Sequence, residues 1–459
     1  MKKITEYLLV VLTMLSVGGC KKDFLEKKPS SSILSPTSIQ ELNALLENTN
    51  IMNKTAALPQ ISADEYKIVS EQNYLALPSV TERNAYIWAK DIYEGEVNAD
   101  WNKLYAQIFY CNNVLKTLND LQLDLLSDGK KTKGWALFDR AYTYFDLMRN
   151  FSSGFQKSTA DVVLGVPLRL GPNVDETLQR SSLKETLEQI ILDVDEAVGL
   201  LEAKVPENNR NRPSKAAAYA LKARIGIYIR DYDMAERSAD SSLKYHDKIV
   251  DYNSISRTSS TPFSYNTAEI IYHSSQIVNY SSLTSYDNLP AIEVNPILIQ
   301  EYAANDLRKS IFYLVNSQGR YNVKRGYAGG GFYAFTGLAC DEIYLIKAEC
   351  LARRGEKDLS LQFLDRLLIN RYLKGSYTSS TASSAENALD MILKERWKEL
   401  VWRGIRWSDL KRLNMESRNI MLSRQIGQAT YTLPANDLRY VFPIPDNEIA
   451  MSGIIQNNR

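Results

Sequence analysis

The stretch "RPSKAAAYALKARIGIYIRDYDMAERSADSSLKY", residues 212–245, predicts two short amphipathic helices joined by a turn. Alanine and leucine recur at helical spacing in its first half, for example at Ala217 and Leu221. An Asp-Tyr-Asp turn follows, and Ala235 and Ala239 then stand four residues apart. Small residues where two helices cross, followed by a turn and a second amphipathic helix, are typical of a tetratricopeptide-like hairpin. Because such a hairpin cannot bury its apolar face alone, the stretch predicts a stack of hairpins.

The same helical pattern returns in three other segments. Residues 101–121 and 133–151 carry aromatic and aliphatic side chains at helical spacing. Residues 338–368 contain a related hairpin, in which Gly355 separates two helices. The repeat length is irregular, so we interpret these segments as degenerate repeats.

The segments between the helices have a different composition. Residues 162–170 and 267–280 are rich in branched side chains and predict short strands. Residues 281–296 and 317–337 are polar, aromatic and partly glycine-rich, and predict long loops. Long ordered loops on a rigid scaffold usually carry the binding site. The sequence therefore predicts a mainly α fold of tetratricopeptide-like helical hairpins, with long loops and a few short β-strands.

The first residues predict export and lipid attachment. Residues 1–19 begin with lysines, continue with an apolar run too short to span a bilayer, and end in two glycines before Cys20. A plain secretory cleavage site also uses small residues, but a cysteine at the cut favours a lipoprotein signal. We therefore expect acylation of Cys20, a lipid-anchored tether over residues 20–34, and a single domain over residues 35–459.

Charge and motif content limit the classes of function. Residues 1–19 hold two of the 55 basic residues and one of the 54 acidic ones, so the remaining chain is electrically balanced. This balance gives no electrostatic reason to expect a nucleic acid partner. The chain has only two histidines, His246 and His273, and no recognisable catalytic, phosphate-binding or metal-binding motif. We expect no enzyme activity, metal or cofactor, although a glycosidase carboxylate pair is defined by geometry and leaves no motif.

Three cysteines follow Cys20 in the sequence. An odd number of cysteines in an exported chain argues against a full disulfide framework. Cys111 and Cys350 lie in helical patterns, which favours buried free thiols. The sequence leaves open whether Cys111, Cys340 and Cys350 form any disulfide.

Aromatic residues provide the candidate binding site. The chain has 28 tyrosines, whose rings combine a flat apolar face with a polar tip. Sugar rings stack on such faces, and their hydroxyls need polar partners. Two clusters lie outside clean helical periodicity, and core packing is the alternative for each of their members. The first is Tyr74, Tyr86, Trp88 and Tyr93, accompanied by Arg83, Asn84 and Asp91; the second is Tyr321, Tyr327, Phe332 and Tyr333.

Two segments near the C-terminus resemble a known family. "ERWKELVWRGIRWSDLKRLN" (395–414) and "YVFPIPDNEIAMSGIIQNNR" (440–459) are similar to late segments of the SusD/RagB family, the nutrient-binding outer-membrane lipoproteins of Bacteroidetes. That family typically has an acidic residue where this chain has Arg403. We interpret the late helices as a structural pair held by Trp402 and Trp407, not as a ligand site. Further similar segments are 20–29, 139–151, 165–168, 212–240 and 341–355.

The resemblance implies a SusD-like fold and a role in nutrient uptake. Family members capture oligosaccharides outside the outer membrane and pass them to a SusC-like TonB-dependent transporter, without a chemical step. By this resemblance the irregular ligand-binding region covers mainly residues 60–100 and 250–335. We expect Trp88 to be the principal ligand contact. The other candidates are Tyr86, Tyr93, Arg83, Asn84, Tyr327 and Phe332.

Three alternatives remain open at this point. A peptide-binding, RagB-like member would take a peptide in place of the glycan. A helical-repeat lipoprotein that binds only protein would have a buried segment from Tyr86 to Tyr93. A surface glycosidase would turn over the glycan that it binds.

Overall fold

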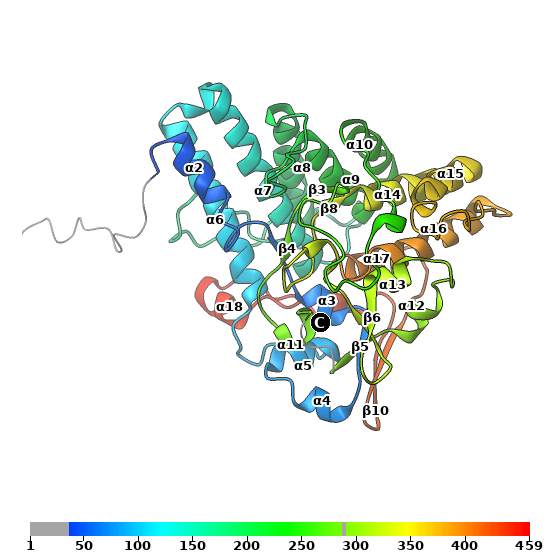
Figure 1. The fold of residues 1–459 in the computed structure, drawn as a ribbon. Coiled ribbons are helices and arrows are strands. Elements are labelled where there is room, and N and C mark those ends of the chain that lie inside the picture. Colours follow the sequence, from blue (N-terminus) through cyan, green and yellow to red (C-terminus); the bar gives the residue numbers. More distant parts are fainter. Residues whose placement is uncertain (1–35, 287–290) are drawn as a thin grey trace, which may run out of the picture. The chain divides into compact units, whose positions relative to one another are not determined.

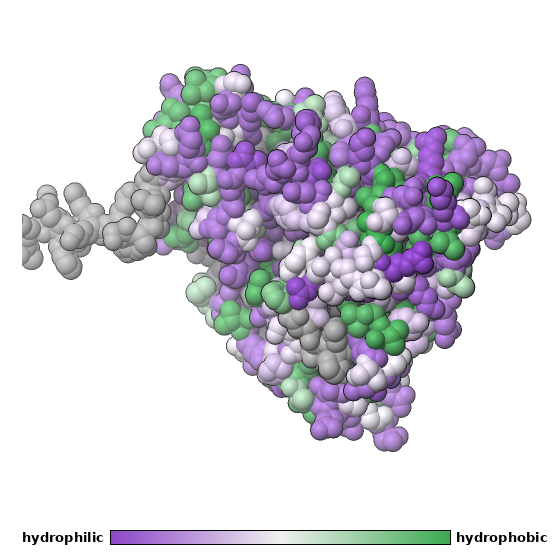
Figure 2. Space-filling model, viewed as in Figure 1, coloured by the Kyte–Doolittle hydropathy of each residue, from purple (hydrophilic) through white to green (hydrophobic). Residues whose placement is uncertain are grey.

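The structure, a computed structural model, describes residues 36–286 and 291–459. Residues Ile39–Arg459 form one compact unit. The predicted signal peptide, Cys20 and the tether over 20–34 lie outside the described residues. Within the described ranges, no helix has the length and apolar character needed to cross a membrane. Figure 2 shows a mainly hydrophilic face with small, separate apolar patches.

Long helices pack side by side as hairpins and make up most of the unit (Figure 1). From α6 to α10, each helix contacts the next one along the chain. Helix α10 then contacts α14, and α14 contacts both α15 and α16. The prediction of a mainly α fold is therefore confirmed. These helices are α6 (Ala99–Asp120), α7 (Ser127–Phe151), α8 (Leu183–Leu200), α9 (Lys215–Ile229), α10 (Tyr232–Tyr245), α14 (Cys340–Arg353), α15 (Lys357–Leu368), α16 (Ala385–Glu399) and α17 (Arg406–Asn414).

The hairpin predicted over residues 212–245 forms helices α9 and α10. Gly226 lies so close to α10 that a Cβ atom there would stand 2.7 Å from the backbone nitrogen of Ala235. Arg230 ends α9 in a left-handed conformation, with φ of 64°. The Asp231 side chain then begins α10 by accepting a hydrogen bond from the Met234 N–H at 2.9 Å. Small residues thus allow the close helix contact that the sequence predicts.

Shorter elements lie between the long helices. The helices are α2 (Ile39–Leu46), α3 (Leu58–Ser62), α4 (Glu71–Leu75), α5 (Val80–Tyr86), α11 (Ser281–Thr284), α12 (Pro296–Gln300), α13 (Arg308–Phe312) and α18 (Asp446–Ser452). Short 3-10 turns span Leu123–Leu125 (η2), Tyr252–Ser254 (η3), Gly326–Ala328 (η4) and Leu438–Tyr440 (η5).

The strands of the described residues pair two by two, and no larger sheet forms among them. Strand β1 (Lys54–Thr55) pairs parallel with β4 (Ser275–Gln276), and the other pairs are antiparallel. These are β2 (Tyr66–Ile68) with β5 (Ile292–Val294), β3 (Ile270–Tyr272) with β8 (Leu338–Ala339), β6 (Tyr313–Val315) with β7 (Tyr321–Val323), and β9 (Leu422–Ile426) with β10 (Ala429–Leu433).

The two strand predictions have different outcomes. Residues 267–280 contain β3 and β4, which confirms strands there. The prediction of a strand over 162–170 is wrong, because this segment makes only an isolated bridge between Leu164 and Ser182. The paired segment enters helix α8 at Leu183, which ends the pairing on one side. On the other side Pro167 has no backbone N–H to donate, so the pairing does not extend into a ladder.

The late motif packs as the helix pair predicted for it, and the turn between its two helices also lines a pocket that is described below. Trp402 and Trp407 are buried. The Arg396 guanidinium on α16 forms an ion pair with Asp409 on α17 at 2.8 Å. The cysteines Cys111, Cys340 and Cys350 are also buried and free, which confirms the prediction for the first and the last.

Candidate functional site

The first aromatic cluster is part of the core. Trp88, Tyr86 and Tyr93 are only 1–2 % exposed. The guanidinium of Arg424, on β9, lies over the rings of Tyr86 and Trp88. It is 3.8 Å from the Tyr86 centroid and 4.6 Å from that of Trp88. The expectation of a surface on which a sugar stacks at these residues is therefore corrected. The rings of Tyr86 and Trp88 pack around a buried cation instead, and the Tyr93 ring is buried apart from it.

Hydrogen bonds hold these side chains in place. The Trp88 indole N–H donates to the Ser62 carbonyl at 2.9 Å, and the Tyr93 hydroxyl donates to the Pro443 carbonyl at 2.8 Å. Arg83 donates to the Leu77 carbonyl, and the Asn84 amide donates to Glu94 at 2.7 Å. The two polar residues thus fix the local loop, although both remain partly exposed.

The second cluster is divided between the surface and a pocket. Phe332 is 52 % exposed, and the Arg325 guanidinium lies 4.3 Å from the centroid of its ring. Tyr327 is buried, and its hydroxyl donates to Glu269. The Phe332 carbonyl accepts a hydrogen bond from the Tyr286 N–H at 3.0 Å. Tyr286 and Tyr327 both line one pocket. The backbone hydrogen bond to Tyr286 therefore connects Phe332 to the wall of that pocket.

We call this cavity the aromatic pocket. Its volume is about 40 Å³, and it lies between the irregular residues 252–335 and the helical platform. Gly326 and Phe312 in its lining are partly exposed, so the molecular surface lies next to the pocket at these two residues. Its lining consists of Tyr252, Phe263, Tyr286, Phe312, Val323, Lys324, Gly326, Tyr327, Phe335, Asp341, Glu399, Val401, Trp402 and Arg403.

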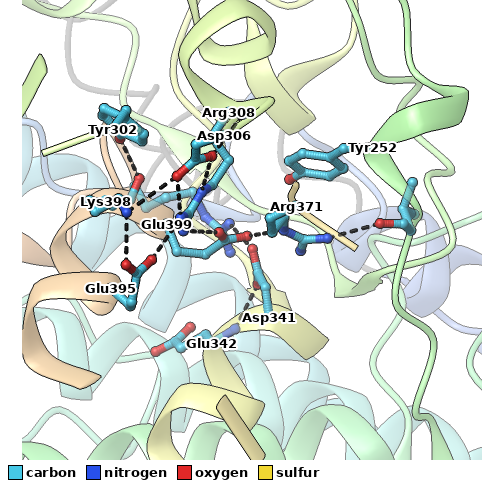
Figure 3. A network of polar contacts seen from close by, with 12 residues as sticks. Tyr252, Tyr302, Asp306, Arg308, Asp341, Glu342, Arg371, Glu395, Lys398 and Glu399 are labelled. Atoms are coloured by element: carbon cyan, nitrogen blue, oxygen red, sulfur yellow. Dashed lines mark hydrogen bonds and ion pairs between the residues drawn. The ribbon is translucent and has the colours of Figure 1, made fainter. Parts of the chain in front are cut away.

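A buried ionic network lies beside the pocket (Figure 3). Glu399 stands between two arginines, with Arg371 at 2.7 Å and Arg308 at 3.0 Å. Arg371 also pairs with Glu269 at 2.7 Å and lies 3.9 Å from the centroid of the Tyr252 ring. Burial raises the pKa of the Glu269 carboxyl above its ordinary value. The network ties the irregular region to α16 and to the segment after α15, and so fixes one wall of the pocket.

A turn after α16 places two unusual side chains at the pocket. Trp402 and Gly404 both have left-handed backbones, with φ of 60° and 64°. One guanidinium nitrogen of Arg403, Nη1, donates to Asp341 at 3.0 Å. Among the described residues, Arg403 Nε and Nη2 and the Trp402 indole N–H have no hydrogen-bond partner, although all three are buried. Buried polar groups normally have partners, so these three donors at one pocket are candidate contacts for a ligand.

The pocket also contains a lysine. The Lys324 ammonium donates to the carbonyls of Arg257 and Ser310, at 2.5 and 2.8 Å. Within the described residues, no acidic group lies within ion-pair distance of it. Flat aromatic walls together with cationic and neutral donors suit a polar ligand that has flat faces.

His273 and the possible metal ligands of the described residues form no catalytic or metal site at this pocket. His273 is buried against Tyr265 and Phe335, and burial lowers its pKa to about 3, so its ring is neutral at physiological pH. Within the described residues, no cluster of His, Cys, Asp and Glu side chains has the arrangement of a metal site. Sequence reasoning missed Trp402 and Arg403 as pocket residues. The visible signal was that Arg403 replaces an acidic residue in the late motif.

Two family models match the chain. One, described as "Starch-binding associating with outer membrane", matches residues 23–227, and the other, the SusD family, matches residues 340–459. Together they span well over half of the 459 residues. The chain belongs to the SusD/RagB family. No curated protein matches it.

Solved SusD structures share this fold. A SusD superfamily protein from Bacteroides thetaiotaomicron is 18 % identical, with a TM-score of 0.73 over 92 % of this chain and 100 % of its own. One from Bacteroides vulgatus is 21 % identical, with a TM-score of 0.71 over 92 % and 99 %. A SusD-like carbohydrate binding protein from Bacteroides vulgatus is 18 % identical, with a TM-score of 0.69 over 91 % and 97 %.

Proposed function

We propose that this protein is a glycan-binding lipoprotein of the cell surface, which captures oligosaccharides and delivers them to a SusC-like TonB-dependent transporter in the outer membrane. It performs no catalysis. Cys20 carries the lipid anchor, and the following tether lets the domain face the cell exterior. Membership of the SusD/RagB family supports this role, as do the starch-binding description of the N-terminal family model and the carbohydrate-binding relative.

The observation that carries the proposal is a pocket lined by unpartnered donors, to whose wall an exposed aromatic residue is bonded through its backbone. Phe332 is half exposed, with the Arg325 guanidinium over its ring, and its carbonyl is bonded to Tyr286 in the pocket wall. Arg403 and Trp402 offer donors without partners among the described residues. In the proposed complex, a sugar ring stacks on Phe332 while a substituent of the ligand accepts hydrogen bonds inside the pocket.

A second candidate function is the binding of protein partners only. The burial of Tyr86, Trp88 and Tyr93 favours it, since this is the feature that the sequence predicts for such a member. A peptide-binding member is the remaining alternative.

A binding screen with two variants tests the proposal. The full chain, purified in mild detergent, is titrated with panels of neutral and acidic oligosaccharides and of peptides. We expect Phe332→Ala to weaken glycan binding by about 1–3 kcal/mol, by analogy with the stacking of bases on aromatic residues. Tyr245→Ala is the control, because Tyr245 is a partly exposed aromatic residue that does not line the pocket.

Each outcome of the screen has a defined meaning. Glycan binding that falls in Phe332→Ala but not in Tyr245→Ala supports capture at this site. Glycan binding that is equal in all three proteins retains the function and rejects the site. Binding of peptides in the absence of any glycan binding replaces the proposal with the peptide alternative. Absence of binding to the oligosaccharides and to the peptides favours the second candidate function, the binding of protein partners only.

A further inference from the structure

Arg403 presents one edge of its guanidinium without a partner. Its Nη1 atom is used by Asp341 at 3.0 Å, whereas Nε and Nη2 have no hydrogen-bond partner among the described residues. The residue is 7 % exposed and lines the aromatic pocket. Nε and Nη2 carry parallel N–H bonds, which is the arrangement that a carboxylate accepts with both of its oxygens.

The rings around Arg403 hold this group in place. Its guanidinium lies 4.6 Å from the centroid of Phe335 and 5.2 Å from that of Tyr327. Because the planar guanidinium is stacked on two rings, the N–H bonds of Nε and Nη2 are already oriented before a ligand binds. Binding therefore costs little conformational freedom.

The acidic groups of the pocket are paired, whereas two nitrogens of Arg403 and the Trp402 indole N–H have no partner among the described residues. Glu399 binds Arg371 with one oxygen and Arg308 with the other. Asp341 binds Arg403 with Oδ2 and accepts the Glu342 N–H with Oδ1. Lys324, by contrast, has only carbonyl oxygens as its partners within the described ranges. The lining therefore offers cationic and neutral donors, and it favours a ligand group that is an acceptor with negative charge.

The size of the pocket limits what enters it. A single water needs about 10–15 Å³, and a cavity of about 150 Å³ holds a six-membered ring. The aromatic pocket, at about 40 Å³, lies between these two values. It therefore accepts a substituent of two or three heavy atoms while the ring that carries it stays outside. A carboxylate has this size and matches the fork of Arg403.

We propose that the aromatic pocket recognises the carboxylate of a hexuronic acid residue, so that the ligand is an acidic oligosaccharide. This inference rests on the proposed function and specifies its ligand. The carboxylate binds Nε and Nη2 of Arg403, the Trp402 indole N–H donates to one of its oxygens, and Lys324 contributes a nearby positive charge. The sugar ring remains at the mouth of the pocket, beside Phe332.

A charged ligand and its neutral ester test the inference. The full chain in mild detergent is titrated with tetragalacturonic acid and with its fully methyl-esterified form, which has the same sugars without the charge. Hydrogen bonds to charged groups are stronger than neutral ones, so we expect the acid to bind about 10- to 100-fold more tightly. In Arg403→Lys, which retains a cation beside Asp341 but loses the fork, we expect this preference to fall about 10-fold.

Controls separate folding from recognition. Thermal unfolding shows whether Arg403→Lys retains the native fold, and the comparison of acid with ester in the unmodified protein does not depend on any variant. Arg354→Lys is the matched control, because the Arg354 side chain is half exposed and does not line the pocket. It should keep the full preference for the acid.

Four results would overturn the inference. Equal affinity for acid and ester excludes recognition of a carboxylate. A preference that is unchanged in Arg403→Lys excludes Arg403 as its source. Binding of neutral oligosaccharides but not of tetragalacturonic acid rejects the acidic ligand and leaves the proposed function standing. Binding of peptides rich in aspartate or glutamate, without binding of any glycan, rejects the inference and the proposed function together.

Discussion

Removal of Arg371 should destabilise the protein strongly, because this side chain connects two buried acids. Arg371 is fully buried and pairs with Glu269 and Glu399, each at 2.7 Å. Its Nη1 atom also donates to the Val250 carbonyl at 2.8 Å. In Arg371→Met, an apolar side chain fills much of the same space, and the charge disappears.

The magnitude follows from what each acid retains. Glu399 still has Arg308 at 3.0 Å, so its charge stays compensated. Glu269 retains only the Val250 N–H and the Tyr327 hydroxyl among its described partners. An uncompensated charge left by breaking a buried pair costs about 3–5 kcal/mol. Loss of the cation–π contact with Tyr252 adds about 1 kcal/mol, part of which the methionine recovers. We therefore expect a loss of about 4 kcal/mol in the free energy of unfolding.

Urea unfolding of single and double variants measures this cost. Adding Glu269→Gln to Arg371→Met removes the uncompensated charge, and we expect it to restore about 2 kcal/mol. Arg418→Met is the control, since Arg418 pairs with the exposed Glu386 at 2.6 Å and should cost below about 1 kcal/mol. A double variant no more stable than Arg371→Met, or a single variant as stable as the control, would refute the reasoning.

The cost of Arg371→Met should also depend on pH. Burial raises the pKa of Glu269 above its unfolded value, and loss of the cation raises it further. A group with a raised pKa in the folded state is protonated in that state at acidic pH, so its penalty develops as the pH rises. We expect the difference between Arg371→Met and the unmodified protein to be smaller at pH 5 than at pH 8.

Three further predictions follow from other buried positions. Trp88→Ala should lower the free energy of unfolding by about 3–5 kcal/mol and leave the glycan affinity of the folded protein unchanged; weaker binding at unchanged stability would contradict the structural role of this ring. Burial raises the pKa of Asp139 to about 8, above its value in the unfolded chain. The protonated, buried carboxyl therefore contributes to the free energy of unfolding at low pH, and this contribution is lost as the pH rises from about 4 to about 8. In Asp139→Asn, the decline in the free energy of unfolding between pH 5 and pH 8, measured by urea unfolding, should therefore be smaller by about 2–4 kcal/mol. An unaltered pH profile would exclude Asp139 as a source of the decline. Gly404→Ala should cost about 1–2 kcal/mol in urea, because φ is 64° there, and an equally stable variant would show that the turn tolerates a side chain.

The hairpins were predictable because their causes are local. Gly226 and Ala235 stand nine residues apart, and their contact, the Asp231 cap and the turn all lie in one short stretch of sequence. The late motif was predictable for a similar reason, since Arg396 and Asp409 lie on consecutive helices and pair with each other. Patterns of this kind carry both partners of an interaction within a few turns of chain.

The burial of the first aromatic cluster was not predictable in this way. The Arg424 guanidinium that lies over Tyr86 and Trp88 comes from a hairpin more than 330 residues later. The left-handed backbone of Trp88, with φ of 56°, also has no sequence signal, since a bulky residue rarely adopts it. Aromatic richness alone therefore does not distinguish a stacking surface from a buried cation site. The partner that decides between them is remote in the chain.

The turn after α16 has energetic costs that a ligand in the aromatic pocket would offset in part. Trp402 adopts a left-handed backbone, which costs about 1 kcal/mol in a residue with a side chain. Each buried donor without a partner costs about 1–3 kcal/mol, and Arg403 has two of them. Asp341 needs only one nitrogen of Arg403, so a shorter cation would satisfy the ion pair at lower cost. A carboxylate in the pocket would pair both remaining nitrogens, and this accounts for an arginine at a position where the ion pair alone does not require its fork.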